Sequence, residues 1–178
     1  MVNNDAILVS RAALTGDKEA FCRLVERYQP SVRGFLFRLS GNEETSKDIA
    51  QETFVRAWLG IGSFRSLSKF STWLFRIAYN VFYDYERSQK DFENIDENIN
   101  FVNQIVDTKR INDAKFDFQT ALQKLKTAER TAMLLFYQDD RSVKEISKIM
   151  NAPTGTVKSH LARGKEKLVK FLENAGYE

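Results

Sequence analysis

The sequence is poor in the residues that carry metal and redox chemistry, with one cysteine and one histidine among 178 residues. The single Cys22 excludes an internal disulfide, which is typical of proteins from a reducing cytoplasm. No metal-ligand spacing, nucleophile elbow or glycine-rich phosphate loop is present. We therefore expect no metal, no cofactor and no catalytic site, and an enzyme that uses His160 is the least favoured alternative.

Long apolar runs are also missing. No stretch approaches the roughly 20 apolar residues that span a bilayer. The first residues, MVNNDAILVSRAAL, lack the basic leader and the apolar core of a signal peptide. We expect a soluble cytoplasmic protein with no membrane insertion.

Proline and glycine are scarce, with two and eight residues respectively. Strand-like alternation is nearly absent and apolar residues recur at the helical period, which predicts an all-α fold. Gly16 and Gly41 mark helix ends, Asp17 is placed to cap the next helix, and Pro30 should bend or split it. The helices expected before residue 89 are 5–14, 17–39, 42–60 and 71–87.

Composition divides the chain into three parts. Residues 89–117 hold 4 Lys/Arg against 7 Asp/Glu, whereas residues 118–178 hold 11 against 7. Asn, Asp and weak periodicity within 89–115 favour an exposed linker, with a helical turn near 101–106. The expected organisation is two small helical domains joined by an acidic, flexible linker, with boundaries at 1–88, 89–115 and 116–178.

The segment from Arg141 to Leu172 reads as a helix, a tight turn and a second helix. Ser142 and Glu145 form a capping box for the first helix, and Thr154 can cap the second. This pattern is typical of a helix-turn-helix, whose second helix lies in the DNA major groove. In the second helix an inward stripe alternates with an outward face that can contact bases and phosphates. The inward stripe is Val157, Leu161 and Leu168, and the outward face is Lys158, Ser159, Ala162 and Arg163.

The helix 42–60 has a buried stripe from Ile49 to Ile61 and an opposite face with one valine, Val55, among polar side chains. Such a face is typical of a protein-docking surface with a polar rim, although an ordinary solvated face has the same spacing. Its polar members are Asp48, Gln51, Glu52 and Arg56.

The helix 71–87 carries three aromatic residues, two arginines and an asparagine away from its expected core stripe. Aromatic rings can stack on unpaired bases while arginines hold phosphates. Packing of the same rings against another helix is the alternative, and spacing alone does not separate the two. This face comprises Thr72, Phe75, Arg76, Tyr79, Asn80, Tyr83 and Arg87, and the preceding loop adds Phe64, Arg65 and Lys69.

Taken in order, these segments closely resemble the extracytoplasmic-function (ECF) group of bacterial RNA polymerase sigma factors. Region 2 of that family is resembled by GDKEAFCRLVERYQPSVRGF, by DIAQETFVRAW and by FRSLSKFSTWLFRIAYNVFYDYERS. Region 4 is resembled by the segment from LQKLKTAERTAMLLFY to GTVKSHLARGKEKL. The likeness covers nearly everything except the expected linker.

The resemblance implies roles and partners for these residues. Asp48, Gln51, Glu52 and Arg56 would dock on the coiled coil of the β′ clamp of core RNA polymerase, and the C-terminal domain would meet the β flap. The −10 promoter DNA would be bound by Phe64, Arg65, Lys69, Arg76, Tyr79, Asn80 and Tyr83. The −35 element would be read by Lys158, Ser159, Ala162 and Arg163, with Arg141 on its backbone. An anti-sigma factor that clamps both domains is a further implied partner.

A stand-alone helix-turn-helix regulator that binds operator DNA as a dimer is the alternative function. It accounts for residues 141–172 but leaves the face at 48–56 and the aromatic face at 75–87 unused. Gly164 departs from the family, which usually has alanine there. Because glycine costs about 1 kcal/mol in a helix, we expect a softer second helix.

Overall fold

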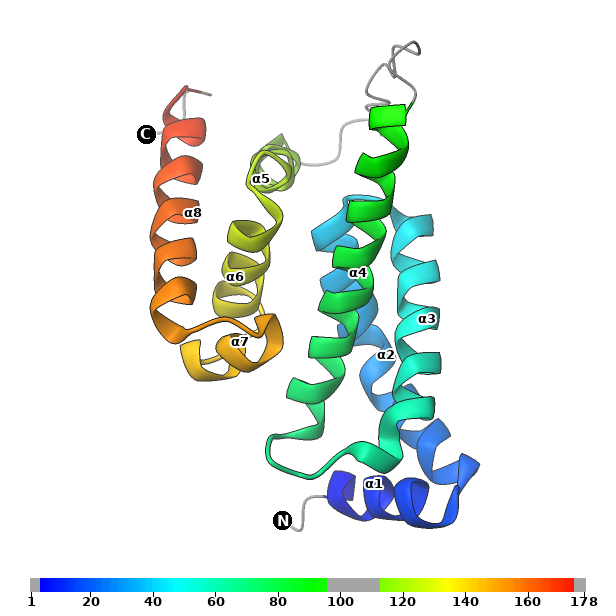
Figure 1. Ribbon diagram of the computed structural model, residues 1–178. Coiled ribbons are helices and arrows are strands. Elements are labelled where there is room, and N and C mark those ends of the chain that lie inside the picture. The colour runs from blue at the N-terminus through cyan, green and yellow to red at the C-terminus, as the bar shows by residue number, and fades with distance from the viewer. Residues whose placement is uncertain (1–3, 96–112, 175–178) are drawn as a thin grey trace.

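The computed structural model describes residues 4–95 and 113–174, and all regular structure in these ranges is helical (Figure 1). The elements are α1 (Asn4–Thr15), α2 (Lys18–Ser40), α3 (Glu43–Gly60), the 3-10 turn η1 (Ile61–Ser63), α4 (Phe70–Ile95), α5 (Asp113–Gln123), α6 (Thr127–Tyr137), α7 (Val143–Met150) and α8 (Thr154–Asn174). The all-α expectation is confirmed for the described residues.

The helix ends in the N-terminal half follow local sequence signals. Gly16 adopts a positive φ of 65° after α1, and the Asp17 side chain accepts a hydrogen bond from the backbone N–H of Ala20 at the start of α2. Gly41, with φ of 71°, closes α2 by donating its N–H to the Phe37 carbonyl. Pro30 lies inside α2 without splitting it, contrary to one of the two outcomes expected for it.

The helix α4 is longer than expected. It continues past Arg87 to Ile95, so residues 89–95 of the expected linker are helical. No glycine or proline occurs between Ser63 and Ile95, and nothing in that stretch stops a helix. The turn expected near 101–106 lies outside the described residues.

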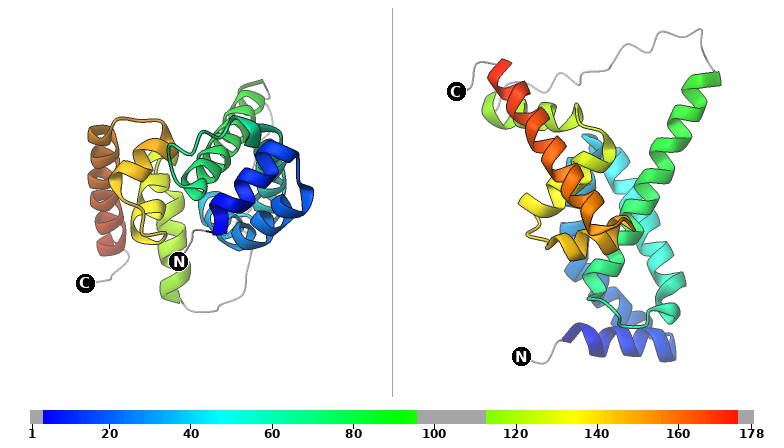
Figure 2. Two further views of the ribbon diagram at one scale, coloured as in Figure 1. Left: turned by 90° about the horizontal axis from the view of Figure 1, so that it is seen from below. Right: turned by 60° about the vertical axis from the view of Figure 1, so that its left-hand side comes forward.

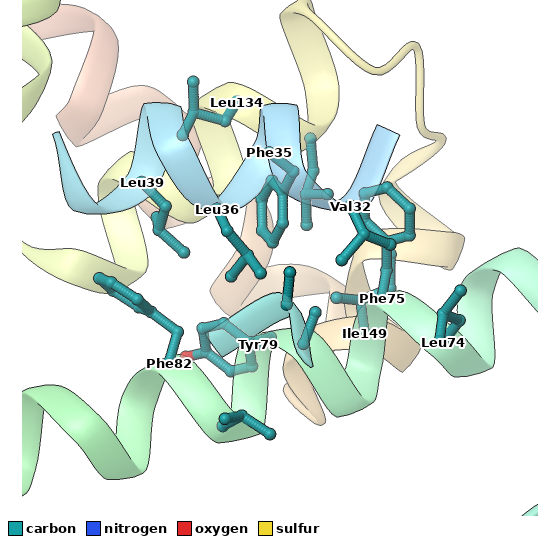
Figure 3. Packing of buried hydrophobic residues seen from close by; sticks show 14 of the residues in the cluster. Val32, Phe35, Leu36, Leu39, Leu74, Phe75, Tyr79, Phe82, Leu134 and Ile149 are labelled. Atoms are coloured by element: carbon teal, nitrogen blue, oxygen red, sulfur yellow. The ribbon is translucent and has the colours of Figure 1, made fainter. Parts of the chain in front are cut away.

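Helices α2, α3 and α4 pack side by side, and α1 crosses one end of this bundle (Figures 1 and 2). The stripe expected on α3 is confirmed, because Ile49, Ala50, Thr53 and Ala57 are buried. The centre of the core comes from fully buried residues of α2 and α4, among them Val32, Phe35, Leu36, Leu39, Leu74 and Phe82 (Figure 3).

Helix α6 is the central element of the C-terminal half, where it contacts both α7 and α8. Seven consecutive residues, 129–135, are buried, including the charged Glu129 and Arg130. Burial alone would raise the pKa of Glu129, but Lys167, 2.7 Å away on α8, and the Lys126 N–H hold it below its ordinary value. The ion pair therefore ties α8 to α6.

The two halves pack directly against each other, mainly through α4 with α7 and α2 with α6. Leu134 of α6 and Ile149 of α7 lie in the same apolar cluster as Phe35 of α2 and Phe75 of α4 (Figure 3). The C-terminal half therefore shares a core with the N-terminal bundle.

Candidate functional site

The helix-turn-helix is built by a capped helix and a left-handed turn. Glu145 accepts a hydrogen bond from the Ser142 N–H and returns its own N–H to the Ser142 hydroxyl, which confirms the expected capping box. Burial alone would raise the pKa of Glu145, but Lys69 and Ser142 together lower it to about 2. Asn151, with φ of 50°, ends α7. The expected cap residue, Thr154, is instead the first residue of α8.

The exposed face of α8 matches the prediction. Val157 and Leu168 are buried, whereas Lys158, Ser159, Ala162 and Arg163 are all exposed. Among the residues that the structure describes, Lys158 and Arg163 form no ion pair. Their charges are therefore available to an anionic partner.

Arg141 points away from this face. Its Nη1 donates to the Ser71 hydroxyl at 3.0 Å, and its guanidinium lies 4.8 Å from the centre of the Phe75 ring on α4. The resemblance placed Arg141 on the DNA backbone, and in this arrangement α4 occupies it instead.

Gly164 is a packing residue. It is buried, and a Cβ at this position would lie 2.8 Å from Cγ of Met133 on α6. The glycine therefore allows α6 and α8 to approach closely, which the sequence pattern alone did not indicate.

We expect Gly164→Ala to lower the free energy of unfolding by about 1–2 kcal/mol, because overpacking against Met133 outweighs the gain of about 1 kcal/mol in helix propensity. In a Met133→Ala background the same change should be neutral or stabilising. Urea unfolding of the four proteins of this double-mutant cycle measures both effects. If Gly164→Ala stabilised the protein in both backgrounds, the claim that a Cβ at position 164 overpacks against Met133 would be wrong.

The α3 face is also exposed as predicted, with Asp48, Gln51, Glu52 and Arg56 all accessible. Arg56 donates to Glu52 at 2.7 Å and to Asp84 of α4 at 3.4 Å, and the hydrogen bond to Glu52 raises the pKa of its guanidinium. Arg56 thus links the exposed faces of α3 and α4.

A groove of about 590 Å³ runs between α2 and α3 beside that face. Phe21 and Trp58, with ring centres 5.0 Å apart, form part of its apolar wall, and Gln51 also lines it. The exposed Val55 and Leu59 extend the apolar surface. An apolar groove with polar neighbours is typical of a protein-docking surface. Sequence reasoning found Gln51 and Val55 but missed the wall from α2.

The prediction of an exposed aromatic face on α4 is partly wrong. Arg76, Asn80 and Tyr83 are exposed, but Phe75 and Tyr79 are only 1% and 8% exposed. The alternative, packing of these rings inside the fold, holds for Phe75 and Tyr79, because both lie in the buried apolar cluster and the ring centre of Phe75 is 5.2 Å from that of Phe35 on α2. Burial also raises the pKa of Tyr79. Thr72, expected on the same face, is buried, and Arg87 is exposed.

The loop before α4 also contains both packed and exposed members of the predicted face. Phe64 is half-buried and packs on Phe70 and Trp73, with ring centres 5.9 and 5.3 Å away. Arg65 is exposed, and the exposed Lys69 donates to Glu145 of α7 at 3.0 Å. The residues expected at the −10 element thus lie along one side of the bundle, partly covered by α7.

Two family models match the chain in the order of these elements. Sigma-70 region 2 matches residues 24–92, and sigma-70 region 4 matches residues 115–168. Both belong to one class of protein, the sigma-70 factors. In the described residues no helix is long and apolar enough to cross a bilayer. The same residues contain no cluster of side chains suited to hold a metal ion.

Comparison with individual proteins over most of the chain identifies a group within the sigma-70 factors. The ECF RNA polymerase sigma factor SigW of Bacillus subtilis is 38% identical over 172 residues, which cover 89% of this chain and 92% of SigW. The RNA polymerase sigma-H factor of Pseudomonas aeruginosa is 31% identical over a region that covers 95% of this chain and 94% of the sigma-H factor. The chain belongs to the ECF group of RNA polymerase sigma factors.

Solved structures share the fold. The sigma factor RpoE of Bartonella quintana, in complex with the anti-sigma factor NepR, has a TM-score of 0.74 and 26% identity, covering 86% of this chain and 96% of its own. CnrH, in complex with the cytosolic domain of CnrY, has a TM-score of 0.71 at 24% identity, covering 97% of this chain and 99% of the CnrH chain.

Proposed function

We propose that this chain binds core RNA polymerase through the α2–α3 groove and directs it to promoters with a −10 and a −35 element. As an ECF factor, the chain is an initiation factor, which binds the core enzyme and directs promoter recognition. The observation that carries the residue assignment is the exposure of the α3 and α8 faces, each beside the buried stripe that orients it.

The α2–α3 groove fits a pair of packed helices such as the coiled coil of the β′ clamp. An apolar helix surface can pack on the wall formed by Phe21 and Trp58, while Gln51 bonds polar groups at the edge. Asp48, Glu52 and Arg56 lie on the same helix as charged partners. The apolar wall of the groove would bury apolar surface of the polymerase, and the polar residues beside it would orient the bound helices.

A second apolar groove suits the β flap. It has a volume of about 350 Å³ and is lined by residues of α5, α6 and α8, including Phe118, Tyr137 and Lys165. Phe118 and Tyr137 remain 37% and 56% exposed, so a partner helix can bury them. The C-terminal half would thereby be anchored to the polymerase on a surface separate from the exposed face of α8.

The two DNA elements are read by different chemistry. On α8, Lys158 and Arg163 contact guanine edges or phosphates. The Ser159 hydroxyl bonds a base edge or a phosphate, and Ala162 contacts a thymine methyl group. On α4, Arg76, Asn80 and Tyr83 follow the single-stranded −10 region. The loop with Phe64, Arg65 and Lys69 and the ring of Tyr79 complete the −10 site.

The mechanism uses binding energy without covalent chemistry. The helices up to the end of α4 and those from α5 onward act as two weak readers, and the polymerase raises the effective concentration of each at its element. Such a factor works where the polymerase is, in the cytoplasm. The chain's likeness to a sigma factor solved with an anti-sigma factor supports an anti-sigma partner here as well.

The single cysteine offers a test of the docking face. Cys22 is exposed and lines the α2–α3 groove. We expect core polymerase to slow maleimide labelling of Cys22 by about tenfold or more, because an interface that excludes water also excludes the reagent. Promoter DNA alone should leave the rate unchanged.

The matched control is Cys22→Ser with Ser31→Cys. Ser31 is exposed and lies nine residues further along α2, half a turn around the helix at about 100° per residue. Its labelling rate should not respond to polymerase. Equal protection of both positions, or of neither, would contradict docking in the groove.

A further inference from the structure

Helix α8 runs beside α6 and rests on it at a position that has no side chain (Figure 1). Gly164 is buried at this position, and a Cβ added to it would lie 2.8 Å from Cγ and 3.2 Å from Sδ of Met133. The backbone oxygen of Glu129 on α6 would lie 3.6 Å from the same Cβ. Because the distance between packed helices depends on the side chains at their contact, Gly164 sets the spacing of α6 and α8.

The neighbouring residues of α8 hold the same face of the helix against α6. Nζ of Lys167 donates to both carboxylate oxygens of Glu129, at 2.9 and 2.7 Å. Leu168 is buried in the apolar cluster. Positions three and four apart share one face of a helix, so Gly164, Lys167 and Leu168 form a single support for α8.

The start of α8 has a second support. The turn from α7 is closed by Ser147, whose hydroxyl bonds the Ala152 carbonyl at 2.6 Å and whose own carbonyl accepts the Ala152 N–H at 3.1 Å. Val157, in the next turn of chain, is fully buried. Val157 and Gly164 lie on the same face, about 10 Å apart at 1.5 Å per residue.

The two charged residues expected to read the −35 element lie between these supports. Lys158 directly follows Val157, and Arg163 directly precedes Gly164. Both side chains are exposed. A displacement of α8 at Gly164 alone would therefore move Arg163 by nearly the whole displacement, whereas Lys158 would stay close to its position.

An alanine at position 164 would produce such a displacement. Met133 is 7% exposed, and the atom in contact is Cγ, close to the α6 backbone, so the side chain has little room to turn aside. Moving α8 outward by about 0.6 Å at Gly164, with Val157 held, tilts the helix by about 3°. Groups that make specific contacts need to be held to within about 0.5 Å.

We propose that Gly164 is a positioning residue for −35 recognition, which together with Met133 sets the tilt of α8 and thereby the bases that Arg163 contacts. This inference rests on the proposed function, since it concerns the reading of duplex promoter DNA assigned there. Gly164 itself is buried and acts only through the position of α8. Alanine at this position should change base preference at the Arg163 end of the helix and leave the Lys158 end unaltered.

The test measures base preference by run-off transcription with core polymerase at limiting factor, on promoters that carry each single-base change in the −35 element. Preference is a ratio between templates, so uniform changes in folding or in polymerase binding cancel. Arg163→Ala and Lys158→Ala first identify the base positions that each side chain reads. A good base contact discriminates by about 5- to 150-fold. We expect Gly164→Ala to lower discrimination by about fivefold at the Arg163 positions and by less than about twofold at the Lys158 positions.

Two further variants separate positioning from other effects of the substitution. Adding Met133→Ala to Gly164→Ala removes the atoms that the new Cβ meets, and should restore the wild-type preference. Gly155→Ala is the matched control, because it makes the same change on α8 where no atom of the described residues lies within 4 Å of the added Cβ. Its preference should equal that of wild type. Circular dichroism establishes that every variant is folded at the assay temperature.

Three results would overturn the positioning role. They are an unchanged preference in folded Gly164→Ala, a change that Met133→Ala does not reverse, and a change confined to the positions read by Lys158. Lower stability with unchanged preference would mean that Gly164 serves packing alone. Transcription by the wild-type chain together with any of these results removes the positioning role and leaves the sigma function intact. If the wild-type chain gives no transcript with core polymerase, the proposed function fails, and this inference fails with it.

Discussion

Reversing two charges on α8, Lys158→Glu with Arg163→Glu, is expected to lower transcription from a −35-dependent promoter by about a hundredfold or more. Both side chains are exposed and unpaired within the described residues. A good base contact contributes about 1–3 kcal/mol, so two lost contacts correspond to about 2–6 kcal/mol before any repulsion from phosphates. Transcript yield at a limiting concentration of the factor measures the effect.

The control reverses one charge, half the change of the double variant, further along the same helix. Lys170→Glu alters an exposed residue of α8 that lies about 18 Å beyond Lys158 at 1.5 Å per residue. Its transcript yield should stay within about twofold of wild type. Equal losses in the control and the double variant would mean that net charge, rather than the exposed face, governs DNA binding.

The second large effect is on stability. Phe35→Ala should reduce the free energy of unfolding by about 3–5 kcal/mol, because it removes a ring from the centre of the core and leaves a cavity. Phe35 is 0% exposed and lies among residues of α2, α4 and α6 (Figure 3). Since a small domain has only about 5–15 kcal/mol in total, this variant should melt far below wild type.

Phe37→Ala is the matched control on the same helix. Phe37 is 44% exposed, so its truncation should cost less than about 1 kcal/mol. Guanidinium unfolding of both variants provides the comparison. Similar losses from the two substitutions would contradict the placement of Phe35 at the centre of the fold.

Local signals in the sequence predicted most of the helices and two exposed faces of the candidate site, on α3 and α8. Caps such as Asp17 and Ser142 define helix starts because their side chains bond the free N–H groups of the first turn. The apolar period of α8 determines which residues face inward, and the exposure of Lys158 and Arg163 follows from it. These features depend on residues close together in the sequence.

The parts that were missed depend on contacts between distant segments. Phe75 and Tyr79 are spaced like a reading face and equally like a second apolar stripe, and only their packing in the folded core decides between the two. The low helix propensity of Gly164 predicts a less stable second helix. Its role in close packing depends on Met133, which lies on another helix. The extension of α4 to Ile95 was missed because polar composition was taken as a sign of a linker.

The most direct test of the central claim is run-off transcription by core RNA polymerase with and without this protein, on a template that carries a promoter of the ECF type. Gln51→Ala and Lys158→Ala alter the polymerase face and the −35 face, and both positions are exposed. A defined transcript that requires the protein and weakens in both variants is the predicted result. Tight binding of DNA by the protein alone, without binding to core polymerase and with no effect of Gln51→Ala, would contradict it and favour the operator-binding regulator.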